Sequence, residues 1–165
     1  MLTKDMQVIR EVNDQAEAFY NKAVQLGQLA VEVLGKDRHA QLTQLENIAN
    51  TALKYTDIFD YIKKQMARIE DWRKEPSGYA KSKPDTQKEQ QPAMGLGGRL
   101  LKELQELQQE QANIAKRLHI EGTSDKERRQ KQQIYLQLIR QFVRQMVAEY
   151  EFRKEFPFSS QSHAK

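Results

Sequence analysis

Four stretches of this chain carry apolar residues at alternating spacings of three and four, and this pattern constrains the fold more than any other feature. Residues at such spacings fall on one side of a helix and form the seam through which helices pack together. The stretches cover residues 3–34, 38–74, 99–120 and 124–156. No stretch alternates with the two-residue period of a strand, and no Asn-Gly or Asp-Gly turn occurs. The sequence therefore predicts an all-α protein.

The connections between the four predicted helices indicate how they pair. Only Gly35, Lys36 and Asp37 separate the first two, so we expect these helices to pack antiparallel as a hairpin. A capping box, Ser124 with Glu127, predicts the start of the fourth helix. We therefore expect an elongated four-helix bundle built from two helical hairpins.

Residues 75–98 differ in composition from the helical stretches. Prolines and glycines stand there among Lys, Gln and Ser, and nothing is apolar enough to pack as a unit. We expect a flexible linker within a single helical domain of residues 1–165. The polar residues 157–165 are expected to form a disordered tail.

Composition excludes several classes of protein. The chain has no cysteine, which removes disulfides, thiol nucleophiles and cysteine zinc sites. The mean hydropathy is −0.86, and no apolar run approaches the ~20 residues of a membrane-spanning helix, so we expect no membrane association. The N-terminus has no signal-peptide pattern. These features predict a cytoplasmic protein.

One pair of acidic residues is a candidate for catalysis. Asp57 and Asp60 are three residues apart, and paired carboxylates can divide acid and base roles when their environments differ. The alternative, which we favour, is an exposed ladder of charges with Lys54, Lys63 and Lys64 at helical spacing.

Other chemical motifs are incomplete. The three histidines have no partner at the spacing of a helical metal motif. Gly95-Leu96-Gly97-Gly98 precedes a helix but lacks a preceding strand and the lysine of a phosphate-binding loop, so we interpret it as a hinge. We expect no enzyme activity, no metal and no cofactor.

The positive charge of the chain is concentrated in its second half. Residues 1–74 contain 11 basic and 11 acidic residues, so residues 75–165 hold the remaining 16 of 27 basic and 12 of 23 acidic ones. The whole net charge of +4 therefore lies in the second half. A local positive field attracts polyanions or acidic partners.

Clusters of basic residues are the candidates for nucleic-acid binding. On the fourth helix they are interleaved with glutamines, and Arg and Gln suit contacts to phosphates, sugars and base edges. The alternative is an ordinary solvated surface. The candidates are Arg128, Arg129, Lys131, Arg140 and Arg144 on the fourth helix, and Lys63, Lys64 and Arg68 on the second.

Apolar residues near helix ends are candidates for a protein interface. Trp72 and Arg73 lie beside the predicted linker, and Phe156 lies near the end of the last helix. Such residues either close the core or form a docking patch for another subunit.

The stretch from Arg140 to Phe152, RQFVRQMVAEYEF, resembles the C-terminal helix of the small helical subunits of type III CRISPR effector complexes. Those helices carry Arg-Phe, then Val-Ala-Tyr and a final aromatic residue. The resemblance implies a non-catalytic subunit that stacks as a short filament and lines the guide–target RNA duplex. It implies that Arg140 and Arg144 contact RNA.

Two functions are therefore expected. The first is a non-catalytic, RNA-associated small subunit of a nucleoprotein complex in antiviral defence. Its partners would be the other subunits and RNA bound without sequence specificity, with possible self-association and no membrane. The second is a structural adaptor that assembles with other proteins through its coiled-coil-like seams.

Overall fold

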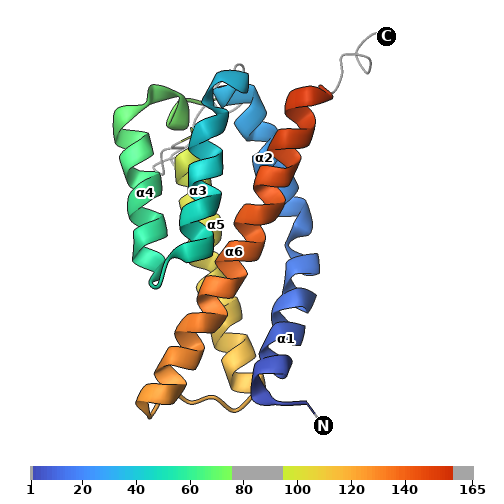
Figure 1. Cartoon of the computed structure of the whole chain (residues 1–165), viewed down its shortest axis with the longest axis vertical. Coiled ribbons are helices and arrows are strands. Elements are labelled where there is room, and N and C mark those ends of the chain that lie inside the picture. Colours follow the sequence, from blue (N-terminus) through green and yellow to red (C-terminus); the bar gives the residue numbers. More distant parts are fainter. Residues whose placement is uncertain (1, 76–94, 158–165) are drawn as a thin grey trace, which may run out of the picture.

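The structure, a computed structural model, describes residues 2–75 and 95–157 of the chain. Most of these residues are helical. No strand occurs within these residues, which confirms the all-α prediction (Figure 1). None of the helices in this part is long and apolar enough to cross a membrane. Residues 2–75 and 95–157 contain six α-helices: α1 (Lys4–Ala18), α2 (Tyr20–Leu34), α3 (His39–Thr51), α4 (Tyr55–Arg68), α5 (Gly95–Arg117) and α6 (Asp125–Glu155). Short 3₁₀ turns, η1 (Lys36–Arg38) and η2 (Glu70–Trp72), occur there as well.

The first predicted helix is present as two segments that follow one another along the bundle. The hydroxyl of Thr3 caps α1 by accepting a hydrogen bond from the Met6 amide at 3.1 Å. At Phe19 the backbone leaves the helical region, with φ −98° and ψ 8°, and α2 continues from there. Gly35, with a φ of 65°, ends α2 in the turn where the sequence predicted it.

The second predicted helix is wrong as a continuous rod, because the chain reverses between Ala52 and Lys54. Both residues are extended, with ψ of 141° and 145°, so α3 and α4 lie antiparallel as a short hairpin (Figure 1). Poor helix formers precede the break, and the Thr51 hydroxyl donates to the Asn47 carbonyl at 2.9 Å. Leu53, at the tip of the turn, is 85% exposed. The molecule therefore differs from two simple hairpins of long helices.

The third predicted helix begins earlier than expected. Gly95, Leu96 and Gly97 are buried and already belong to α5. A side chain on Gly97 would collide with the side chain of Met66, so this position needs glycine for close packing. The hinge predicted at residues 95–98 is thus wrong. Residues 76–94 of the predicted linker 75–98 and residues 158–165 of the predicted tail 157–165 lie outside the described residues.

Helix α6 is the central element of the fold and packs against α1, α2, α3 and α5. Its start is the predicted capping box, since the Ser124 hydroxyl accepts from the Glu127 amide at 3.1 Å. The Glu127 carboxylate accepts from the amides of Gly122 and Thr123, and these hydrogen bonds hold its pKa below the usual range. Ten residues of α6 are buried: Ile134, Tyr135, Leu136, Leu138, Ile139, Phe142, Val143, Met146, Val147 and Tyr150.

The tightest contact of α6 is with α2. A Cβ atom added to Gly27 would lie 2.6 Å from both the Met146 carbonyl oxygen and the Glu149 Cβ. The absence of a side chain at Gly27 is therefore what lets the two helices approach so closely. Further along, the Tyr150 hydroxyl donates to the Gly35 carbonyl at 2.6 Å, and Gln145 donates to the Ala16 carbonyl at 3.1 Å.

Candidate nucleic-acid interface

The outward side of α6 is basic and amide-rich. From Arg128 to Ala148 the helix holds five basic residues, six glutamines and no acidic residue. Six of its polar residues follow one another at spacings of three or four and therefore lie on one side of the helix. We call this set the α6 stripe; it consists of Lys126, Arg129, Gln133, Gln137, Arg140 and Arg144. At 1.5 Å per residue the stripe is roughly 27 Å long.

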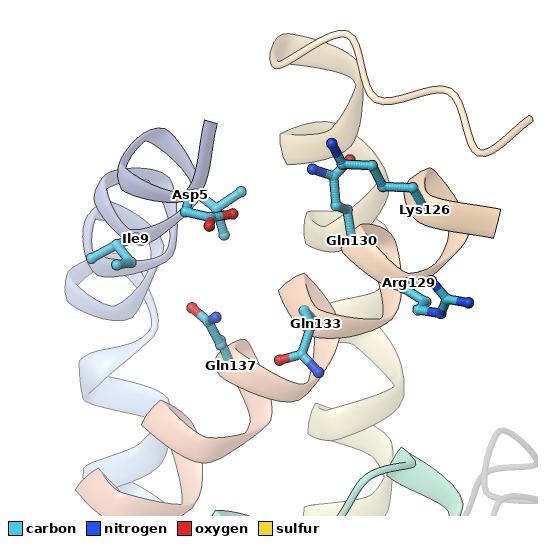
Figure 2. Close-up of a pocket in the computed structure, with 8 residues that line it drawn as sticks. Asp5, Ile9, Lys126, Arg129, Gln130, Gln133 and Gln137 are labelled. Atoms are coloured by element: carbon cyan, nitrogen blue, oxygen red, sulfur yellow. The ribbon is translucent and has the colours of Figure 1, made fainter. Parts of the chain in front are cut away.

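A groove of about 450 Å³ runs between the N-terminal parts of α1 and α6. Figure 2 shows side chains of both helices around it, with Gln137 and Gln133 below and Gln130 and Lys126 above. The α6 side is formed by Lys126, Arg129, Gln130, Gln133 and Gln137. The α1 side is formed by Asp5, Val8 and Ile9.

The polar side chains from α6 in this groove are not used by the fold. The structure records no hydrogen bond or ion pair for Lys126, Arg129, Gln133 or Gln137 within the described residues. Lys126, Arg129 and Gln133 are exposed, and Gln137 is half-buried. These side chains are available to a ligand.

Arg140 does not turn outward as the sequence predicted. Its guanidinium donates to the carbonyls of Ala49 at 2.8 Å and Ala52 at 3.1 Å. These oxygens lie at the end of α3, where helical carbonyls lack partners and the helix dipole favours a cation. Arg140 therefore fastens α3 to α6, whereas Arg144, four residues later, is exposed and has no recorded partner among the described residues.

Two other predicted residues of α6 are partly engaged. The Arg128 guanidinium forms an ion pair with Asp125, which lies in the same first turn. Lys131 reaches across to donate to the Glu121 carbonyl at 3.4 Å. Both remain close to the stripe, but neither belongs to it by helical position.

The basic residues of α4 form a separate cluster. Lys63, Lys64 and Arg68 are exposed, and the structure places them on a helix that packs on α3 and α5. The candidate catalytic pair, Asp57 and Asp60, is also exposed on α4. Asp57 lies 3.7 Å from the Lys54 ammonium, as the charge-ladder interpretation expects. The α4 cluster is therefore a surface of mixed charge.

The predicted interface residues have different surroundings. Trp72 is fully buried, and its indole N–H donates to Gln41 Oε1 at 2.6 Å, so its interface role is wrong and it belongs to the core. Arg73 is exposed and donates to the Met66 carbonyl at 2.8 Å. Phe156 is 61% exposed and lies 5.1 Å from the ring of Phe152.

Sequence reasoning missed the α1 wall of the groove. Ile9 lies outside the buried seam of Val8, Val12 and Ala16, and it is 51% exposed. An isoleucine out of phase with its seam was the available signal. The surroundings of Ile9 depend on how α1 and α6 pack, and no local sequence pattern predicts this packing.

No group of three potential metal ligands occurs among the residues that the structure describes. Comparisons of the chain with protein-family models, with curated proteins and with solved structures find no match.

Proposed function

We propose that this chain is a non-catalytic, cytoplasmic, RNA-associated subunit of a nucleoprotein complex of the CRISPR effector kind, and that it contacts RNA through the α6 stripe. The single observation that supports this most is the acid-free, glutamine- and arginine-rich outward side of α6. The resemblance of residues 140–152 to the small helical subunits of such complexes supports it independently. The partners are RNA and the other subunits of the complex.

Charge explains how such a surface binds RNA. Lys126, Arg129 and Arg144 are exposed cations along one side of the helix, spaced so that several phosphates can be contacted together. Contacts of this kind release counterions and depend little on base sequence, so binding weakens steeply as salt rises. Arg140 supports the surface by holding α3 in place instead of contacting phosphate.

The decisive experiment measures RNA affinity against salt concentration for the intact chain. In the variant Lys126→Ala, Arg129→Ala, Arg144→Ala, the slope of log affinity against log salt falls by about 2, at ~0.7 per lost contact to a single strand. A matched control removes three exposed cations elsewhere: Lys22→Ala, Lys36→Ala and Lys102→Ala. Both triple variants remove the same net charge. An equal decrease of the slope in the two variants would therefore mean that net charge alone governs RNA binding, and it would contradict the proposal.

A second candidate function is a protein adaptor, favoured by the exposed pair Phe152 and Phe156 at the end of α6. Exposed aromatic pairs are typical anchors of protein interfaces. Sedimentation of the wild type and of Phe152→Ser, Phe156→Ser separates the two functions. Self-association lost in the variant, with no RNA binding by either protein, would favour the adaptor.

A further inference from the structure

We propose that the groove between α1 and α6 is a pocket for an unpaired nucleobase, so that the chain prefers single-stranded RNA to duplex. The inference rests on the proposed RNA-binding function and deepens it by naming the form of RNA that the surface takes. Backbone contacts along a helix do not require a groove, so the groove's own chemistry needs an explanation.

The wall on α1 is apolar and fixed in position. Ile9, which is 51% exposed, lines the groove beside the nearly buried Val8. Besides its packing against α6, this part of α1 makes polar contacts with the end of α5. Arg117 of α5 donates to the Glu11 carboxylate at 2.8 and 3.0 Å, and Lys4 donates to the Leu118 carbonyl at 2.7 Å. The groove is thus preformed, and a flat apolar face can lie against Ile9 without the helices moving apart.

The wall on α6 is polar and carries both donors and acceptors. Gln133 and Gln137 line the groove from successive turns, with the Gln137 amide turned toward α1, and Gln130 lies above them (Figure 2). Each amide offers a carbonyl acceptor and an NH₂ donor, so it can pair with a donor or with an acceptor on the edge of a base. Asp5 adds an acceptor on the opposite side.

The shape and charge of the groove select the ligand class. A volume of about 450 Å³ is within the range of small-ligand pockets and much larger than a phosphate needs. Lys126, above the groove in Figure 2, and Arg129, which also lines it, supply the cations for the adjoining phosphate. An apolar wall, an amide wall and cations at the rim together match a nucleotide whose base is splayed out. Bases in a duplex are stacked and paired, so they cannot enter.

The test compares three probes at one salt concentration: a short single-stranded RNA, its duplex, and the same single strand with abasic positions. Wild type is expected to prefer the single strand over both others by roughly tenfold, the effect of one or two hydrogen bonds. Gln133→Ala, Gln137→Ala keeps charge and helix propensity, so its three affinities should converge on that of the duplex. The variant Ile9→Ala should also bring the affinity for the single strand closer to that for the duplex.

The control variant Gln105→Ala, Gln108→Ala removes two exposed glutamines of α5 and should leave the preference intact. Equal binding of the three probes by wild type would overturn the nucleobase pocket and leave the phosphate-binding function standing. A preference that survives in Gln133→Ala, Gln137→Ala would also overturn it. Failure of all three probes to bind would overturn the proposed function as well.

Discussion

The two halves of α6 present the same apolar side to the core but use their polar side chains differently. In the C-terminal half Arg140, Gln145 and Tyr150 each donate to a backbone carbonyl of another element. In the N-terminal half Arg129 and Gln133 border an open groove and have no recorded partner among the described residues. The N-terminal half also uses Tyr135 and Lys131 to hold the fold, but it leaves the polar side chains on its groove side to a ligand.

This difference follows from what surrounds each half. The C-terminal half runs beside helix ends, at Ala16, Gly35 and Ala52, where carbonyls need donors. The N-terminal half runs beside the middle of α5, where the Tyr135 hydroxyl donates to the Leu104 carbonyl at 2.8 Å, and its other side borders the groove beside α1. Polar side chains of the same type are therefore structural where a carbonyl of another element lies within reach, as at Arg140, and available where none does, as at Arg129 and Arg144.

The largest expected effect comes from the close contact of the C-terminal half. Gly27→Ala places a methyl group 2.6 Å from the Met146 carbonyl oxygen, which forces α2 and α6 apart. We expect a loss of about 1–3 kcal/mol in the free energy of unfolding. Urea unfolding followed by circular dichroism measures it. The exposed neighbour substitution Gln25→Ala should stay within about 0.5 kcal/mol of wild type, and equal effects would contradict the packing account.

The paired arginines sharpen the comparison most directly. Arg140→Ala leaves the Ala49 and Ala52 carbonyls without their donor and should cost about 1–2 kcal/mol of stability, with RNA affinity unchanged in the folded protein. Arg144→Ala should leave stability unchanged and weaken RNA binding. Thermal unfolding and fluorescence anisotropy of both variants separate the roles. The reverse pattern would show that the assignment of the two residues is wrong.

The start of the N-terminal half depends on its capping box. Ser124→Ala removes the acceptor for the Glu127 amide and should cost about 1 kcal/mol. Hydrogen exchange should show the loss as faster exchange in the first turns of α6, with the region around Tyr150 unaffected. Thr43→Ala on an exposed position of α3 is the control. Uniformly faster exchange along α6 would mean that the two halves are not separable.

A smaller effect concerns alkaline stability. Burial raises the pKa of Tyr150 to about 12 from the ordinary value of 10.0, because the folded protein favours the neutral phenol. The unfolded chain ionises first, so the contribution of Tyr150 to the free energy of unfolding is constant well below pH 10 and falls as pH rises from 10 toward 12. Tyr150→Phe should flatten this decline, whereas Tyr20→Phe, half exposed on α2, should not. An identical decline in all three proteins would contradict the burial account.

Local signals in the sequence predicted α6 well and the second helix poorly. Ser124, Glu127 and Pro157 mark the ends of α6, and these signals act within a few residues. The turn at Ala52–Lys54 was missed because the apolar seam continues in phase across it, through Ala49, Ala52 and Phe59. The preceding Asn and Thr residues were the only warning. Continuity of a seam does not guarantee continuity of a helix.

The candidate site was predicted in part. Basic and amide residues of α6 could be identified from the sequence, because helical spacing places them on one side. The structural role of Arg140 could not be predicted from the sequence, because its two carbonyl acceptors lie 88 and 91 residues away in the chain. The apolar wall from Ile9 is likewise defined only by the packing of α1 beside α6. Tertiary contacts decide which members of a basic stripe are available.

Crosslinking of bound RNA to the intact protein, mapped by mass spectrometry of its peptides, tests the central claim most directly. Crosslinks should fall on α6 between residues 126 and 144 and on residues 5–9 of α1. Crosslinks confined to residues 63–68 of α4, or spread evenly over all basic surfaces, would contradict the assignment of RNA binding to the α6 stripe and the groove beside α1.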